Sequence, residues 1–210
     1  MDINFILFIL AGYLIGGIPF GFIIGKMRGV DVRTVGSKNI GATNVYRTVG
    51  HKWGFLAFFC DFLKGCLPTV AAAWFVQHQP QLFTSSKEVL ANLPVWVGLA
   101  CVFGHTLTPY MKFKGGKGVA TAFGMLMAQI PLLALSAFAI FVVTVWLSHY
   151  ISLGSMLAAG LLAIAIWIPT GLAEPTLPLQ IVVTLIGVFV IYKHKSNIVR
   201  LVKGCENKIY

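Results

Sequence analysis

The sequence predicts an all-α polytopic membrane protein with about seven transmembrane or half-membrane helices. Of its 210 residues, 58% are hydrophobic and only 10% are charged, a balance typical of a chain that lies mostly within a lipid bilayer. Several apolar runs reach the length of about 20 residues that crosses a hydrocarbon core of about 30 Å. The runs cover residues 3–25, 53–76, 94–111, 117–129, 131–147, 151–170 and 176–193. We therefore expect one integral membrane domain over residues 1–210.

Two of the runs are shorter than a full crossing. Segments 94–111 and 117–129 are either tilted spans or half-helices that dip toward a site. The first, second and last runs are long enough to cross easily. Residues 117–147 are too many for one ordinary span, and Pro131 divides them. This division gives seven segments.

The positive charges test this count. The chain has 16 Lys and Arg against 6 Asp and Glu, and its basic residues concentrate at 26–52, at 112–117 and after residue 193. Cytoplasmic loops carry the excess of Lys and Arg in membrane proteins. Seven segments place all three basic stretches on the cytosolic side, with the N-terminus outside and the C-terminus in the cytosol. Five spans with two re-entrant pieces give the same parity.

One polar stretch, Gly104–Thr121, lies between two apolar segments. Its glycines would let backbone N–H groups converge on an anion, and Lys117 would add a positive charge. A helix that began near Val119 would direct its N-terminal N–H groups and its dipole to the same place. The stretch therefore predicts a phosphate cradle; the alternative is a basic loop that only sets the topology.

The connection from Gly36 to Gly50 is a second candidate site. Ser37 is a natural helix N-cap, and Gly50 is a natural stop. On a helix between them, Ser37, Asn44 and Arg47 would share about a third of the circumference. Such a face could bind a polyol phosphate, because a guanidinium pairs with phosphate while the amide and the hydroxyl bond hydroxyl groups. The alternative is an interfacial helix whose Arg47 contacts lipid phosphates.

Two more polar stretches lie on the predicted cytosolic side. The hydroxyl of Ser155 could bond a phosphate or satisfy the backbone of its own helix. His194 and Asn197 lie at i and i+3, where the last apolar segment ends. A histidine there could act as a base or as a phosphate donor. The alternative is a basic terminus that snorkels to the membrane surface.

Asp61 and Lys64 lie at i and i+3 inside an apolar run. Charges at membrane depth are costly and are usually paired or functional. We expect an ion pair that ties the second helix to its neighbours rather than a catalytic pair. The glycines of the first run, from Gly12 to Gly25, predict close helix packing.

The sequence lacks the motifs of several other kinds of catalytic or metal site. None of the five histidines begins an H-x-x-x-x-D motif, and the sequence contains no G-x-S-x-G elbow. The four cysteines have neither metal-ligand spacing nor a disulfide pattern, so we expect no metal and no cofactor. The net charge of +10 fits an excess of Lys and Arg in cytosolic loops together with an anionic substrate or lipid surface. These explain the charge better than nucleic-acid binding does.

Taken together, these stretches resemble the bacterial acyl-phosphate:glycerol-3-phosphate acyltransferase family over nearly the whole chain. The family often has Ser where Gly17 stands and Arg where Lys195 stands. The motifs that carry the resemblance are Gly-Gly-Ile-Pro-Phe in the first helix, Gly-Ser-x-x-x-Gly-x-x-Asn-x-x-Arg from Gly36 to Arg47, Asp61-x-x-Lys64-Gly65, the stretch from Gly104-His105 to Thr121, and the tail from His194 to Glu206.

The resemblance implies an enzyme of the bacterial inner membrane whose active site faces the cytosol. Such an enzyme transfers a fatty acyl group from acyl phosphate to the 1-hydroxyl of glycerol 3-phosphate. The products are lysophosphatidic acid and phosphate, in the first acylation of phospholipid biosynthesis. Its partners would be the two substrates and membrane lipids, with no obligatory protein partner. A transporter for an organic phosphate is the alternative, but it would show weak inverted repeats.

The resemblance also implies a role for each candidate residue. The residues assigned to acyl phosphate are Gly36, Ser37, Gly115, Gly116, Lys117, Gly118 and Thr121. The residues assigned to glycerol 3-phosphate are Ser37, Asn44, Arg47, Lys117, Ser155, His194 and Asn197. Arg47, Lys117 and His194 would be catalytic by stabilising charge. Because acyl phosphate is already activated, proximity and charge stabilisation would suffice, and the leaving phosphate could take the proton.

Overall fold

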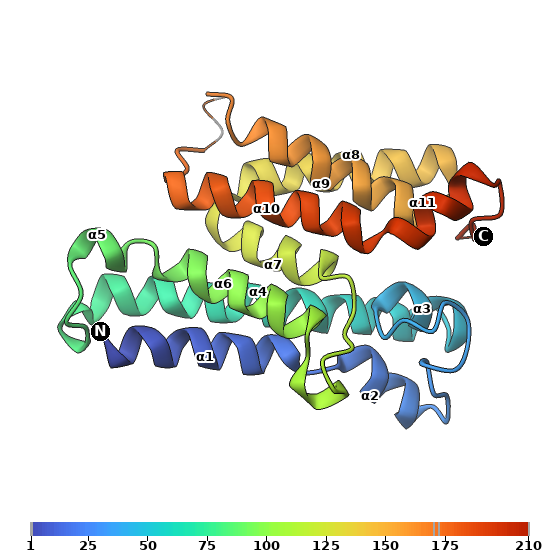
Figure 1. The fold of residues 1–210 in the computed structure, drawn as a ribbon, viewed down its shortest axis with the longest axis horizontal. Helices are drawn as coiled ribbons and strands as arrows, with labels where there is room; N and C mark the ends of the chain where they lie inside the picture. The colour runs from blue at the N-terminus through green and yellow to red at the C-terminus, as the bar shows by residue number, and fades with distance from the viewer. Residues whose placement is uncertain (1, 170, 172, 210) are drawn as a thin grey trace. The chain divides into compact units, whose positions relative to one another are not determined.

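The computed structural model describes residues 2–169, 171 and 173–209, and these form helices and loops without a strand (Figure 1). The helices are α1 (Ile3–Gly17), α2 (Phe20–Met27), α3 (Ala42–Thr48), α4 (His51–His78), α5 (Lys87–Leu90), α6 (Leu93–Thr106), α7 (Val119–Gln129), α8 (Pro131–Ser148), α9 (Ile151–Ala165), α10 (Leu177–Lys193) and α11 (Lys195–Val202). Short 3-10 turns cover Pro80–Leu82 and Pro109–Met111. The all-α prediction is confirmed.

The chain divides into two compact units, residues 1–129 and residues 130–210. The first unit contains α1 to α7, and the second contains α8 to α11. One functional domain over residues 1–210 stays a prediction.

Four stretches of the described chain are long and apolar enough to cross a membrane: Ile3–Met27, His51–His78, Lys87–Met111 and Pro131–Ser148. Helices α10 and α11 pass the same test only together, across a bend of 54°. The expectation that the last run spans easily was therefore too simple.

Two further helices are shorter. As expected, α7 is short, and α9 ends at Ala165, before the expected end of its run at residue 170, which lies outside the described residues. The segment expected to be short at 94–111 belongs to a stretch of 25 residues. The number of full crossings and the orientation stay predictions.

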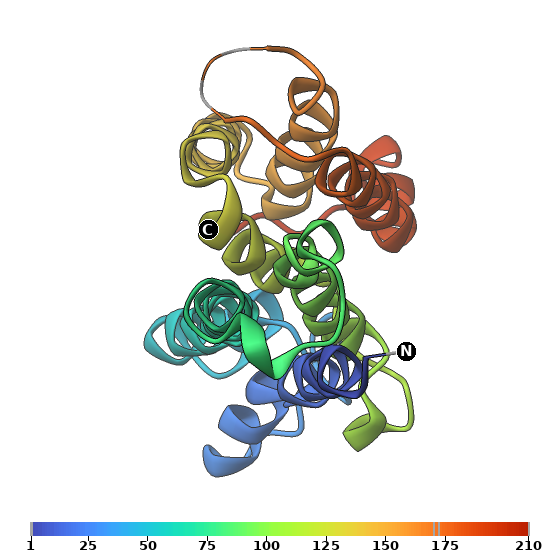
Figure 2. The same cartoon turned by 90° about the vertical axis from the view of Figure 1, so that its left-hand side faces the viewer.

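Small residues bring the helices of the first unit into close contact, as their spacing predicted. A Cβ on Gly12 would lie 2.9 Å from the Val97 carbonyl oxygen, and a Cβ on Gly16 would overlap the backbone of Cys101. On α4, a Cβ on Gly65 would overlap the Thr121 carbonyl. Figure 2 looks nearly along α1 (blue) and α4 (teal), and α1 pairs with α6 while α4 pairs with α7.

The first apolar run is broken into two helices, although its sequence predicted one continuous segment over residues 3–25. Helix α1 ends at Gly17, and α2 begins at Phe20, after Pro19. Proline has no N–H to continue the helical pattern. The Ile18 carbonyl at this break accepts a hydrogen bond from Lys64 Nζ at 2.8 Å. Lys64 also forms an ion pair with Asp61 at 2.7 Å, so the predicted structural tie is confirmed.

In the second unit, α9 packs between α8 and α10. A Cβ on Gly154 would lie 3.0 Å from the Phe141 carbonyl oxygen, and one on Gly187 would lie 2.9 Å from that of Ala159. The C-terminal tail packs back on the connection between α8 and α9, where the Ile209 N–H donates to the His149 carbonyl at 2.9 Å.

The predicted orientation can be tested by labelling single cysteines. Lys38, Lys114 and Lys208 are exposed and lie in the three basic stretches. We expect cysteines at these positions, in a chain without the exposed native Cys205, to react only with a membrane-permeant maleimide in intact cells. Labelling of any of the three by an impermeant maleimide from outside would contradict the seven-segment topology.

Candidate active site

The first connection is mostly a loop. Helix α3 begins only at Ala42 with Gly41 as its N-cap, so Ser37 is not a helix cap and does not share a helical face with Asn44. That prediction was wrong. Gly50 follows the end of α3 with φ +125° and donates to the Val45 carbonyl, so the predicted stop is confirmed.

The Asn44 side chain explains why the helix starts late. It is 1% exposed, and its Nδ2 donates to the carbonyls of Val32 at 2.8 Å, Asn39 at 2.9 Å and Val35 at 3.2 Å. Its Oδ1 accepts from the Ser37 N–H at 2.9 Å. These bonds satisfy a buried amide and fold residues 32–39 around it. Asn44 therefore holds the loop that carries exposed Ser37, and its role as a substrate ligand stays a prediction.

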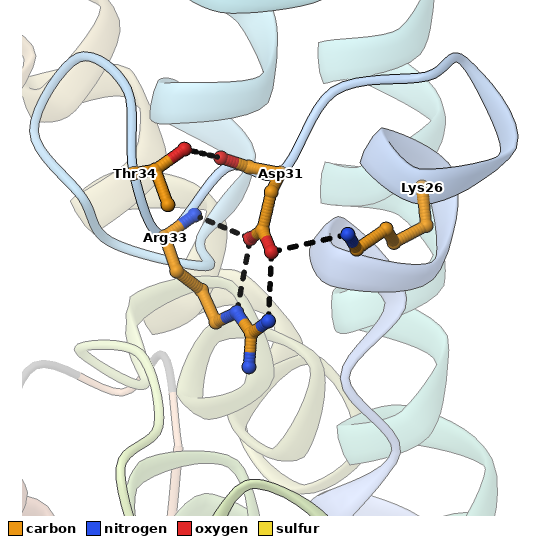
Figure 3. A network of polar contacts seen from close by, with 4 residues as sticks. All are labelled: Lys26, Asp31, Arg33 and Thr34. Atoms are coloured by element: carbon orange, nitrogen blue, oxygen red, sulfur yellow. Dashed lines mark hydrogen bonds and ion pairs between the residues drawn. The ribbon is translucent and has the colours of Figure 1, made fainter.

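A surface ion network closes the start of this loop (Figure 3). Asp31 accepts from Arg33 Nη2 at 2.7 Å and from Arg33 Nε at 2.9 Å, and it lies 3.1 Å from Lys26 Nζ. The Arg33 guanidinium, and then Lys26, hold the pKa of the Asp31 carboxyl well below its usual range. At neutral pH the carboxylate is ionised, so it neutralises part of the basic charge in this connection.

Arg47 lies in the last turn of α3 and is half-buried, with its Nε shielded from solvent. The helix is seated on α4, because a Cβ on Gly54 would overlap Tyr46. Tyr46 also stacks on His51 with ring centroids 4.3 Å apart. A guanidinium on such a fixed helix can pair with a phosphate in two-point geometry.

The glycine loop, residues 112–118, differs in part from the predicted cradle. The Gly115 N–H donates to the Thr106 carbonyl at 3.2 Å, and the Gly116 N–H donates to the His105 carbonyl at 3.1 Å. These two N–H groups bind the end of α6, so the expectation that they converge on an anion was wrong. The assignment of Gly115 and Gly116 to acyl phosphate stays a prediction.

The amides suited to an anion lie at the start of α7. That helix begins at Val119, as expected, after Gly118 with φ +83°. The first turn of a helix leaves N–H groups without intrahelical partners, and the dipole adds positive potential there. Half-buried Lys117 precedes this turn. Thr121 is fully buried, and its Oγ1 has no hydrogen-bond partner among the described residues.

The two sites of the first unit lie at the same end of it. Met111, in the turn before the glycine loop, packs against the hydrophobic cluster that includes Val32, Ile40 and Val45. Figure 1 shows α2, α3 and the loop before α7 together at this end of the unit. Arg47 and Lys117 thus come from neighbouring elements.

In the second unit, His194 lies at the bend between α10 and α11 and is 3% exposed. Its Nδ1 is 2.7 Å from the Val190 carbonyl oxygen, which can only accept, so Nδ1 carries a proton. Nε2 is then an acceptor in the neutral ring and a donor only in the imidazolium. Of the two predicted roles, the base requires the neutral ring and the phosphate donor requires the imidazolium.

Glu206 organises the tail of the second unit. It accepts from Asn197 Nδ2 and Arg200 Nε at 2.7 Å each and from Ser152 Oγ at 3.0 Å. Burial alone would raise the pKa of Glu206, but the hydrogen bonds from Asn197, Arg200 and Ser152 outweigh it and lower the pKa. In the sequence, Glu206 stood out only as the last residue of the tail motif that begins at His194.

Asn197 and Ser155 both donate hydrogen bonds within the second unit. Asn197 is 6% exposed and is oriented by Glu206. Ser155 Oγ donates to the Ile151 carbonyl at 2.9 Å, which satisfies the helix backbone. The hydroxyl oxygen keeps acceptor capacity, so its role as a substrate ligand stays a prediction.

The hydrogen bonds of Glu206 should contribute measurably to the stability of the protein. Glu206→Gln should destabilise the protein by about 1.5–3 kcal/mol at neutral pH, because hydrogen bonds to a charged acceptor are lost. The lowered pKa means that the carboxylate stabilises the fold above the unfolded value of about 4.3, and that this stabilisation disappears as the pH falls below it. Thermal unfolding in detergent between about pH 3.5 and 7.5 measures this. Exposed Glu88→Gln is the control, and equal shifts for both variants would refute the role of Glu206.

Comparison with known proteins shows the family of the chain. Residues 6–204 match the family model described as glycerol-3-phosphate acyltransferase. The chain belongs to the glycerol-3-phosphate acyltransferase family. A member of that name from Trichlorobacter lovleyi is 46% identical over 204 residues, covering 96% of both chains. Another from Fusobacterium nucleatum is 42% identical over 205 residues, covering 97% of both.

Solved structures of the family give the same answer. The integral membrane glycerol 3-phosphate acyltransferase PlsY, in its glycerol 3-phosphate form, is 36% identical with a TM-score of 0.84, covering 98% of this chain and 95% of that one. Its lysophosphatidic acid form has a TM-score of 0.82. The chain is thus an integral membrane glycerol-3-phosphate acyltransferase of the PlsY type, and the resemblance drawn from its motifs is confirmed.

Proposed function

We propose that this chain transfers a fatty acyl group from acyl phosphate to the 1-hydroxyl of sn-glycerol 3-phosphate. The observation that carries the proposal is the pair of PlsY structures, one described as a glycerol 3-phosphate form and the other as a lysophosphatidic acid form. The second ligand is the first with one acyl group added. A PlsY-type chain that bound both would therefore bind acceptor and product of one acyl transfer.

The chemistry of the donor suits the residues of the first unit. The hydroxyl oxygen attacks the acyl carbon, the bond from that carbon to the phosphate oxygen breaks, and phosphate departs with the bonding electrons. Negative charge develops on the acyl oxygen and grows on the leaving phosphate. Lys117 and the α7 N-terminus offer a cation and backbone N–H groups for this charge. The proton of the hydroxyl leaves with the phosphate or passes to a protein base.

The residues that the family resemblance assigns to glycerol 3-phosphate stay its proposed ligands. In this proposal Arg47 pairs with the glycerol phosphate and exposed Ser37 bonds its phosphate or hydroxyl groups. His194 contributes Nε2, and Asn197, held by Glu206, contributes its amide oxygen. A site that binds two phosphorylated substrates at a membrane surface requires this concentration of positive charge. We place it at the cytosolic face of a bacterial inner membrane.

The test is transfer by purified protein in detergent. Radiolabelled glycerol 3-phosphate is offered with palmitoyl phosphate, palmitoyl-CoA or palmitoyl-acyl carrier protein in separate reactions. We expect labelled lysophosphatidic acid from palmitoyl phosphate alone, with release of one phosphate per product. Transfer from either thioester without acyl phosphate would overturn the assignment of the donor while leaving the acyltransferase family intact.

A further inference from the structure

A buried polar cluster, Asp61, Lys64 and His105, lies in the first unit beneath the glycine loop. Asp61 Oδ1 is 2.7 Å from Lys64 Nζ and 3.6 Å from His105 Nδ1, and the three side chains are 2% to 6% exposed. Lys64 also binds the Ile18 carbonyl. The cluster therefore links α4 and α6 to the break between α1 and α2. Buried charges are costly and are usually paired or functional.

The His105 ring extends from this cluster to the glycine loop. Its Nδ1 is directed at Asp61, at an electrostatic distance longer than a hydrogen bond. The opposite edge contacts Gly116, where an added Cβ would overlap Nε2 and lie 2.9 Å from Cε1 and 3.1 Å from Cδ2. The three nearest atoms to that Cβ thus all belong to His105.

The loop backbone is bound to the same residue. Gly116 donates its N–H to the His105 carbonyl, and Gly115 donates to the adjacent Thr106 carbonyl. A Cβ on Gly115 would overlap the His105 carbonyl as well. The ring and the backbone of His105 therefore fix both glycines, and side chains at either position are excluded.

Lys117 directly follows Gly116, and the Cα atoms of consecutive residues are about 3.8 Å apart. A displacement of Gly116 would thus displace Lys117 and the start of α7. Binding and catalytic groups lose most of their effect when they move by about 1 Å. The position of the His105 ring sets the position of Lys117 through this short connection.

We propose that His105, oriented by Asp61, is a positioning residue that holds the glycine loop so that Lys117 meets the acyl-phosphate head. The inference rests on the proposed function, because it assigns this loop to the acyl donor. Lys117 is assigned to both substrates, but the loop itself only to acyl phosphate, so changes at His105 should act mainly on the KM for acyl phosphate. A residue that only filled space would lower the amount of folded protein, and so Vmax, without a change in either KM.

Two substitutions at position 105 each mimic one of the two ring nitrogens. Asparagine at position 105 keeps a donor near Nδ1 but removes the edge that contacts Gly116, whereas glutamine places an amide near Nε2. We expect His105→Asn to raise the KM for palmitoyl phosphate about tenfold and the KM for glycerol 3-phosphate, to which Lys117 is also assigned, by a smaller factor. His105→Gln should recover part of the loss. The control is Val97→Ala, which opens a cavity in the same helix away from the loop.

Hydrogen exchange reports the loop without any activity. We expect the peptide covering residues 107–118 to exchange faster in His105→Asn than in the wild type, with no change in Val97→Ala. Unchanged exchange together with an unchanged KM for palmitoyl phosphate would overturn the proposal. If the wild type does not use acyl phosphate, the donor assignment fails, whereas the exchange result still decides whether His105 holds the loop.

Gly116→Ala covers the case in which His105→Asn does not fold, and a double-mutant cycle with His105→Ala tests the contact where that variant folds. The φ of Gly116 lies outside the left-handed region, so the ring and not the backbone excludes alanine there. Gly116→Ala should therefore raise the KM for palmitoyl phosphate by itself. Combined with His105→Ala, it should cost no more than His105→Ala alone, because the ring it collides with is gone. Strictly additive losses, or a normal KM in Gly116→Ala, would refute the contact as the cause.

Discussion

Arg47→Lys should lower kcat/KM for glycerol 3-phosphate by about ten- to a hundredfold, the loss expected when a charged hydrogen bond in a partly desolvated site disappears. Lysine keeps the charge but replaces the planar two-point fork by a single ammonium. Because α3 is seated on α4 through Gly54, the lysine Nζ cannot recover the lost contact by a shift of the helix. Steady-state kinetics with varied glycerol 3-phosphate at saturating acyl phosphate measure the effect.

Arg28→Lys is the matched control for this change. Arg28 is also an arginine of the first unit, but it is exposed and lies over the Trp53 ring at 4.8 Å. We expect wild-type kinetics for it. If Arg47→Lys folds normally and also has wild-type kinetics, Arg47 does not bind the acceptor, and the lipid-phosphate alternative gains support.

Local sequence signals predicted the elements whose cause is local. Gly118 and the apolar residues after it placed the start of α7, and Pro131 placed the division before α8. The i, i+3 spacing of Asp61 and Lys64 predicted their ion pair. Pro19 gave the same kind of signal for a break, but the high hydropathy around it masked the break in the first run.

The residue types of the candidate site stay a prediction, and its contacts could not be predicted from the sequence. A helix from Ser37 to Gly50 fitted the periodicity, yet the Asn44 amide draws residues 32–39 into a loop through bonds that span up to 12 positions. The glycines of the loop suggested an anion nest, whereas their N–H groups bind His105 and Thr106. Periodicity cannot reveal such bonds, because they join backbone groups to partners on other elements.

His194 is the residue whose role the structure sharpens most. Its Nδ1–H is committed to the Val190 carbonyl, so any action on substrate must come from Nε2. A neutral ring there could accept the proton of the acceptor hydroxyl, and an imidazolium could donate to a phosphate. We expect the second role, since the proposed donor, acyl phosphate, is activated enough that a protein base is not required.

His194→Asn tests this, because the asparagine Nδ2 can still donate to the Val190 carbonyl while Nε2 is lost. We expect kcat/KM for glycerol 3-phosphate to fall by about ten- to a hundredfold, mainly through KM, with turnover recovered at saturating substrate. The control is His78→Asn, since Nδ1 of exposed His78 makes the same i−4 contact with the Trp74 carbonyl, at 3.0 Å. A general base contributes about 10²–10⁴-fold, so its loss would remain at saturating substrate. If kcat falls that far in both His194→Asn and His194→Gln, and the wild-type rate rises with one group that titrates between about pH 5 and 8, His194 is the base.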